Sequence, residues 1–244
     1  PIEVLALAKA VPGVREAVGL GQLDAAAVFA KRDVIVDHLN DGGVTAELQQ
    51  SGLTVIHAHG RLGGPREVTV THPDNREETV RARQAVVLAT GTRPTIPDVP
   101  GLAEARPWTN RDLANMTHVP PRTLILGGGV VGVEFATILA GLGSKVTLLA
   151  RGDTLLRNSE TVASEMVTES LRRKGVDLRF QAQLSSVTRP VAGGTVSATV
   201  GDQDIKVDEI VVAAGRIVNT DDLGLETVGL RPGEFVAVDD HLHA

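Results

Sequence analysis

Apolar residues recur at helical spacing in one early segment of the chain and then give way to alternating patterns. Between Leu23 and Leu39 the apolar positions follow the helical period, and Asp24 is of the residue type that caps a helix. From Leu53 onward, short runs alternate apolar and polar residues, and glycine, proline, aspartate or asparagine separates them. This pattern predicts one strand followed by a hairpin-like pair of strands. The three runs are LTVIHAHG (53–60), REVTVT (66–71) and ETVRAR (78–83).

A continuously apolar run and a proline-rich segment come next. The run AVVLA (85–89) has no polar position, which predicts a strand buried on both faces of a parallel sheet. The segment TGTRPTIPDVPG (90–101) interrupts regular structure with prolines and glycines. We therefore expect a crossover between two domains at this point.

The second half of the chain predicts an α/β arrangement. One β-α-β period is expected from strand Thr123–Leu126, a helix from Val130 to about Leu142, and strand Lys145–Leu149. A second helix is predicted from Ser159 to Lys174. One face of that helix is expected to carry Val162, Met166, Val167 and Leu171. Strands are predicted at 176–180, 185–190, 195–200 and 208–215, the middle ones forming a small antiparallel excursion.

Composition and charge narrow the class of protein. The net charge is −6 without any block of like charges, so neither nucleic acid nor an anionic membrane surface is an expected partner. No apolar run approaches the roughly 18 residues of a membrane span. Cysteine is absent, which excludes disulfides and thiolate metal sites. We expect no metal site and a cytoplasmic location.

A glycine-rich turn supplies the first candidate for chemistry. The stretch LILGGGVVGVE contains the pattern G-x-G-x-x-G at Gly127, Gly129 and Gly132, between a predicted strand and a predicted helix. Such a turn brings backbone close to a dinucleotide pyrophosphate, and the helix start favours its charge. We expect this site to include Gly127, Gly128, Gly129, Val130, Val131 and Gly132. The alternative is a tight turn with only a structural role.

Two arginines stand where NAD-binding sites carry an acidic residue. In KVTLLARGDTLLR (145–157) the second strand ends at Ala150, and Arg151 and Arg157 follow. An acidic residue there would bind a ribose 2′-hydroxyl and repel a 2′-phosphate, whereas guanidinium groups bind phosphate. The sequence therefore favours NADPH over NADH. The alternative is two solvated surface arginines.

Four spaced motifs together resemble the flavoprotein disulfide reductases. They are ATGTRP (89–94), GGGVVGVEFA (127–136), VVAAGRIVNTDDLGLE (211–226) and VAVDDHL (236–242). In that family a first Rossmann module binds FAD, an inserted module binds the nicotinamide nucleotide, and a C-terminal domain forms the dimer. The resemblance implies a partial FAD-binding domain at 1–93, an inserted NAD(P)-binding domain at 94–216, and a return into the FAD-binding domain at 217–244.

The resemblance also assigns individual residues. It implies FAD contacts at Gly60, Ala89, Thr90, Gly91 and Arg216, and a position near the nicotinamide for Gly215. Glu134 matches a glutamate that points into the nicotinamide–flavin region, although an acidic residue near a helix start is also favoured by the helix dipole alone. The spacing of Arg151 and Arg157 resembles that of NADPH-specific members.

The chain departs from the family pattern in several places. An N-terminal G-x-G-x-x-G, a redox cysteine pair and a dimerisation domain are missing, so we expect an internal piece of a longer enzyme. Val130 stands where some members have a tyrosine, and Val218 where proline is usual.

The function expected from these features is that of an FAD-dependent oxidoreductase. Hydride would pass from NADPH to flavin and then to an unidentified acceptor, and the full-length protein would be a homodimer. One alternative is a stand-alone dinucleotide-binding module without turnover. Another Rossmann enzyme, such as a methyltransferase, is disfavoured by the ATG (89–91) and AAGR (213–216) segments.

Overall fold

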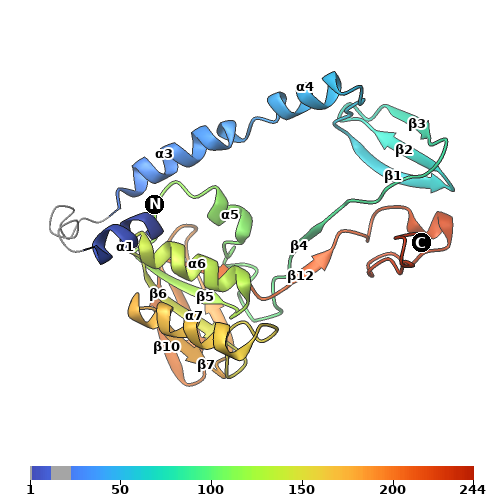
Figure 1. The fold of residues 1–244 in the computed structure, drawn as a ribbon. Helices are drawn as coiled ribbons and strands as arrows, with labels where there is room; N and C mark the ends of the chain where they lie inside the picture. The colour runs from blue at the N-terminus through green and yellow to red at the C-terminus, as the bar shows by residue number, and fades with distance from the viewer. Residues whose placement is uncertain (1, 12–22) are drawn as a thin grey trace. The chain divides into compact units, whose positions relative to one another are not determined.

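A computed structural model describes residues 2–11 and 23–244. The chain divides into two compact units (Figure 1). Unit 1 contains residues 1–38 and 94–215, and unit 2 contains residues 39–93 and 216–244. Residues 1–38, which the family resemblance assigns to an FAD-binding domain, are thus grouped with the glycine-turn segment.

Unit 1 is built on a four-stranded parallel sheet with strand order β11-β5-β6-β7. This confirms the predicted α/β fold with a parallel sheet. A second, antiparallel sheet has the order β10-β9-β8, which confirms the predicted excursion. The strands are β5 (Arg122–Leu126), β6 (Lys145–Ala150), β7 (Asp177–Phe180), β8 (Leu184–Thr188), β9 (Val196–Val200), β10 (Gln203–Val207) and β11 (Glu209–Val212). The helices are α1 (Ile2–Ala10), α3 (Ala25–Ile35), α5 (Asn110–Ala114), α6 (Val130–Gly141) and α7 (Thr161–Arg173).

The parallel sheet of unit 1 is covered on both faces. Ile125 of β5 belongs to a core cluster with residues of helices α6 and α7, whereas its neighbours Leu124 and Leu126 belong to a second cluster with β8, β9 and β10. Alternate residues of one strand therefore face the two layers, as the period of a strand requires.

Helix α7 buries only part of the apolar set that the sequence placed on one face. Val162 and Met166 are exposed, and the face that packs on the core carries Ser164, Val167 and Leu171. The prediction was wrong for the first two because it followed apolar residues alone, and the buried stripe passes through a serine.

Two polar pairs hold the amino ends of the unit 1 strands. The Arg122 guanidinium at the start of β5 binds Asp208 through Nε–Oδ2 and Nη2–Oδ1 contacts of 3.0 and 2.7 Å. Glu209 at the start of β11 pairs with Arg189, Nη2 to Oε1 at 2.5 Å, and both side chains are over nine-tenths buried. Burial raises the pKa of Glu209, although hydrogen bonds from the Ile210 N–H and from Arg189 act against the rise.

Helix α3 confirms the predicted cap and corrects the predicted end. The Asp24 side chain accepts hydrogen bonds from the main-chain N–H groups of Ala26 and Ala27. The helix ends at Ile35, because Asp37, His38 and Leu39 all take positive φ values and form the turn η1 (Asp37–Leu39). Within the described residues, no helix is long and apolar enough to cross a membrane.

Unit 2 contains a small antiparallel sheet of order β1-β2-β3. The predicted hairpin-like pair is confirmed as β2 (Glu67–Thr71) and β3 (Glu77–Arg81), while the predicted strand 53–60 is replaced by β1 (His59–Gly64). The unit also has α4 (Gly42–Gln50), β12 (Arg216–Val218) and η2 (Leu225–Val228), and β12 pairs with the crossing strand β4 (Thr92–Pro94).

The segment 85–89 is not a strand, so this prediction was wrong. Val87 is 85% exposed and Leu88 is 38% exposed, and no described strand pairs with this run. An apolar sequence becomes a central parallel strand only where neighbouring strands hydrogen-bond to it on both sides. In the described part of the chain these neighbours are missing.

Candidate functional site

The first and third glycines of the turn after β5 are required by the fold itself. Gly127 has a φ of 121°, and a Cβ there would lie 2.2 Å from the carbonyl oxygen of Ala213. A Cβ on Gly132 would lie 1.9 Å from the carbonyl oxygen of Gly127. Both contacts are with backbone, which cannot move aside cheaply, so a side chain at either position would disrupt the turn.

The middle glycine, in contrast, is not required by the fold. Gly129 has an ordinary φ of −81°, and apart from its own atoms and those of its two chain neighbours, no atom lies within 4 Å of the position a Cβ would take. It precedes helix α6, and no side chain caps the first turn of that helix. The first main-chain N–H groups of a helix lack intrahelical partners and favour an anion. The open space before Val130 and Val131 thus fits the predicted pyrophosphate contact.

The segment 151–157, which we call the arginine loop, packs directly on this turn. The Leu156 N–H donates to the Gly128 carbonyl over 2.8 Å, and the Gly152 carbonyl accepts from the Gln181 N–H over 2.9 Å. Leu155 is fully buried. A Cβ on Gly128 would lie 3.0 Å from both the Ala150 Cβ and the Leu155 Cδ2. The glycine turn and the arginine loop are therefore adjacent at the carboxyl edge of the sheet, where ligands of such folds bind.

Both predicted arginines lie exposed on this loop. The Arg157 Cδ lies 3.2 Å from the position that a Cβ on Gly152 would take, so its stem rests against the residue that follows Arg151. Neither guanidinium forms an ion pair with a carboxylate of the described residues, whereas Arg93, Arg122 and Arg189 each do. The preceding Ala150 offers no acidic group. The loop also carries the exposed carboxylate of Asp153, but its two exposed guanidiniums can still bind an anion.

Two further predicted nucleotide residues lie near the same sheet edge. Gly215 follows β11 with a φ of 143°, and its carbonyl accepts from the Thr95 N–H over 3.0 Å. It stands two residues beyond Ala213, whose carbonyl abuts Gly127. Glu134 is exposed on α6. The roles of Gly215 and Glu134 toward nicotinamide stay predictions.

The residues assigned to FAD lie in unit 2. Gly60 is on β1, while Ala89, Thr90 and Gly91 belong to an exposed connection. Arg216 donates from Nη2 to the Thr92 carbonyl over 2.6 Å and also contacts the Thr92 hydroxyl. These five FAD assignments stay predictions.

Asn219 organises the ATG segment, and the sequence did not single it out. Its Nδ2 donates to the Thr90 carbonyl over 2.9 Å and its N–H donates to the Gly91 carbonyl over 3.1 Å. Arg93 donates to Asn219 Oδ1 and binds both carboxylate oxygens of Asp221. The Arg93 hydrogen bonds hold the pKa of Asp221 below its usual range. In the sequence, the only sign of this role of Asn219 is that short polar residues follow Val218.

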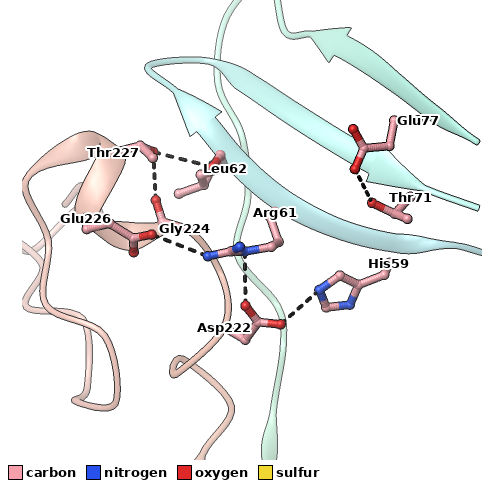
Figure 2. A network of polar contacts seen from close by, with 9 residues as sticks. All are labelled: His59, Arg61, Leu62, Thr71, Glu77, Asp222, Gly224, Glu226 and Thr227. Atoms are coloured by element: carbon pink, nitrogen blue, oxygen red, sulfur yellow. Dashed lines mark hydrogen bonds and ion pairs between the residues drawn. The ribbon is translucent and has the colours of Figure 1, made fainter. Parts of the chain in front are cut away.

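A polar network fastens η2 to β1 beside Gly60 (Figure 2). Asp222 contacts His59 Nε2 at 3.3 Å and Arg61 Nε at 3.1 Å, and Arg61 also reaches Glu226 at 3.3 Å. The Leu62 N–H donates to the Leu223 carbonyl over 2.8 Å. These contacts show that the His59 side chain takes part in the packing within unit 2.

A parallel sheet, a glycine turn that opens a helix, and an adjacent loop after the second strand are typical of dinucleotide-binding α/β folds. The chain matches the model of the family described as pyridine nucleotide-disulphide oxidoreductase over residues 3–244. The chain therefore belongs to the pyridine nucleotide-disulphide oxidoreductase family, and the resemblance read from its motifs is confirmed.

Individual relatives agree with this family. Glutathione reductase of Burkholderia cepacia is 33% identical over 94% of this chain and 51% of its own length. Mercuric reductase of Shigella flexneri is 32% identical over 87% of this chain and 38% of its own length. The soluble pyridine nucleotide transhydrogenase of Marinobacter nauticus is 37% identical over 67% of this chain and 35% of its own length. The chain thus spans only about half, or less, of the curated relatives it matches.

Solved structures show the same fold. LpdA of Mycobacterium tuberculosis is 27% identical, with a TM-score of 0.77 over 98% of this chain and 53% of its own. The HOCl-induced flavoprotein disulfide reductase RclA of Escherichia coli is 23% identical, with a TM-score of 0.80 over 98% of this chain and 52% of its own.

Proposed function

We propose that this chain is the nicotinamide-nucleotide-binding part of an FAD-dependent oxidoreductase that takes hydride from NADPH and passes it to an acceptor. Flavin supplies the hydride-accepting chemistry when it is bound, and the protein supplies binding and orientation. The family supports an oxidoreductase, and the alternative of a binding module without turnover has no observation in its favour. A methyltransferase does not fit the family match.

The observation that carries the proposal is the combination of an open Gly129 with the arginine loop. Gly129 leaves room for an anion at an uncapped helix start, and the loop that follows β6 is hydrogen-bonded to the same turn. A pyrophosphate at the turn and a phosphate at the loop are the two anionic groups of NADPH. We therefore propose Gly127, Gly128, Gly129, Val130, Val131, Gly132, Glu134, Arg151, Arg157 and Gly215 as the NADP-binding residues.

The preference for NADPH over NADH rests on charge. Arg151 and Arg157 have no carboxylate partner among the described residues, and Ala150 replaces the acid that would bind a ribose 2′-hydroxyl. A 2′-phosphate would supply the missing negative charge, and guanidinium–phosphate contacts are stronger than neutral hydrogen bonds.

The proposed domain arrangement is an NAD(P)-binding domain at 94–216 inserted into an FAD-binding domain at 1–93 and 217–244. Support comes from the chain crossings, because β4 and β12 pair where the chain leaves and re-enters unit 2. FAD contacts from Gly60, Ala89, Thr90, Gly91 and Arg216, and a homodimer of the full-length protein, remain part of this proposal. The acceptor is unidentified, because the names of the relatives point to different substrates.

The test is NADP⁺ binding by the 244-residue protein with Gly129→Val and a matched control. Gly43, near the start of α4, also has nothing within 4 Å of its Cβ position, so Gly43→Val makes the same change away from the site. We expect calorimetry to detect NADP⁺ binding by the wild type and Gly43→Val and none by a folded Gly129→Val. Undiminished binding by Gly129→Val would place the nucleotide elsewhere.

A further inference from the structure

A buried serine stands on the core-facing side of α7. Only 6% of Ser164 is exposed, and it shares its helix face with Val167 and Leu171. A serine on a helix often bonds to the carbonyl four residues earlier, but the Ser164 hydroxyl instead donates to the Leu155 carbonyl over 2.7 Å. The partner of this buried hydroxyl is therefore in the arginine loop and not in its own helix.

The hydrogen bond from Ser164 fixes one side of a peptide unit whose other side is also held. The carbonyl of the Leu155–Leu156 peptide accepts from Ser164, and the N–H of the same peptide donates to the Gly128 carbonyl over 2.8 Å. Leu156 has a φ of 49°, in the left-handed region that a leucine rarely adopts. Such a conformation persists only where its surroundings hold it. Ser164 and Gly128 hold the Leu155–Leu156 peptide, and the Ser159 N–H holds the next peptide by donating to the Leu156 carbonyl over 2.8 Å.

The residue that follows this peptide is Arg157. Its Cδ lies 3.2 Å from the position of a Cβ on Gly152, so the stem of Arg157 rests on Gly152 beside Arg151. The direction in which the chain leaves Leu156 decides whether the Arg157 stem can pack against Gly152. Tilting the Leu155–Leu156 peptide would move Arg157 and leave Arg151, on the other end of the loop, largely in place.

We propose that Ser164 is a positioning residue that sets the preference of this site for a 2′-phosphorylated nucleotide by fixing the Leu155–Leu156 peptide and, through it, Arg157. The inference rests on the proposed function, in which the arginine loop binds the 2′-phosphate. It adds a residue on a different helix that determines specificity without contacting the nucleotide.

The test compares two buried serines in the 244-residue protein. Ser144 is 7% exposed, and its hydroxyl bonds to the Thr123 hydroxyl at 2.9 Å at the amino end of the sheet, away from the arginine loop. Ser144→Ala therefore removes a similar buried hydrogen bond at the opposite edge. Calorimetry gives the ratio of the Kd of ADP-ribose to that of 2′-phospho-ADP-ribose for wild type, Ser164→Ala and Ser144→Ala.

We expect Ser164→Ala to lower this ratio by about threefold to tenfold, which is the value of one ordinary hydrogen bond, through weaker binding of the 2′-phosphorylated ligand. The Kd of ADP-ribose should change by less than about twofold, since its pyrophosphate lies at the glycine turn. Ser144→Ala should keep the wild-type ratio. A general loss of stability would be expected in both serine variants, so it would not lower the ratio of the two Kd values in Ser164→Ala alone.

An unchanged ratio in Ser164→Ala, while Arg157→Ala lowers it, would overturn the role of Ser164 and leave the proposed function intact. Equal affinity of the wild type for both ligands would overturn both. If Ser164→Ala does not fold, Ser164→Cys keeps the volume with a weaker donor and is expected to lower the ratio in the same direction. A wild-type ratio in folded Ser164→Cys would then count against the inference.

Discussion

The main-chain N–H of Leu156 donates to the carbonyl of Gly128 over 2.8 Å, so the arginine loop and the glycine turn form one hydrogen-bonded unit. The pyrophosphate contact and the 2′-phosphate contact are proposed on the two halves of this unit.

Two glycines of the turn, Gly132 and Gly129, are predicted to respond differently to substitution. Gly132→Ala would bring a methyl group to 1.9 Å from the Gly127 carbonyl, and we expect it to lower the free energy of unfolding by about 2 kcal/mol or more. Gly129→Ala has open space around the new methyl group and should cost less than about 1 kcal/mol, the scale of an altered helix cap. Urea unfolding measures both. Equal losses would contradict the division between structural and ligand-related glycines.

Stability is predicted to depend on pH through Glu209. Its folded-state pKa is raised by burial, so the folded protein binds more protons than the unfolded chain in the range above about pH 4. The contribution of Glu209 to stability is therefore fully present below the unfolded pKa and is lost as the pH rises through the folded pKa.

Glu209→Gln tests this dependence, because it removes the titrating group. The free energy of unfolding of Glu209→Gln, measured from pH 4 upward, should fall less steeply with pH than that of the wild type, although the variant leaves Arg189 buried without its anionic partner. Glu165→Gln, on the exposed side of α7, is the control and should retain the wild-type slope. A Glu209→Gln profile parallel to the wild type would show that burial does not dominate the pKa of Glu209.

The 244-residue protein is expected to retain little FAD. Ala89, Thr90 and Gly91 are exposed, the neighbouring Val87 is 85% exposed, and Arg216 donates to Thr92. The measurement is the flavin released on denaturing the purified protein, relative to the protein concentration. We expect far less than one flavin per chain, and a near-stoichiometric amount would mean that the described residues bind FAD in an arrangement different from this structure.

Local patterns predicted much of unit 1. Asp24 as a helix cap, the glycine turn with its flanking strand and helix, and the antiparallel excursion depend on neighbouring residues, and all three are present. The resemblance carried by short motifs predicted the family. The ligand roles of Arg151, Arg157 and the FAD-assigned residues stay predictions.

The errors arose where structure depends on distant partners. The run 85–89 has the composition of a buried strand, but no described strand pairs with it. On α7 the apolar residues Val162 and Met166 were expected to share a face with Val167 and Leu171, but both are exposed, and Ser164 is buried with Leu171 because its hydroxyl has a partner nine residues earlier in the sequence. Neither fact can be read from periodicity.

The loss of either arginine should reduce the preference for a 2′-phosphate without removing nucleotide binding. Arg151→Ala and Arg157→Ala each delete one charge-assisted contact on an exposed loop, and a loss of about threefold to thirtyfold in the preference is expected for each. Calorimetry with ADP-ribose should give nearly unchanged affinity for both variants. Arg172→Ala, at the end of α7, is the control for loss of a surface charge. If the variant with both Arg151→Ala and Arg157→Ala kept the wild-type preference, neither arginine would bind the 2′-phosphate, and both would be ordinary solvated surface residues.

The most direct test of the account is the affinity of the wild-type chain for 2′-phospho-ADP-ribose against ADP-ribose, measured by calorimetry at two salt concentrations. The arginine loop predicts tighter binding of the 2′-phosphorylated ligand by about tenfold or more at low salt, and a smaller preference at high salt because exposed charges are screened. Equal affinities, or a preference that salt does not change, would contradict the proposed NADPH site and favour NADH as the donor.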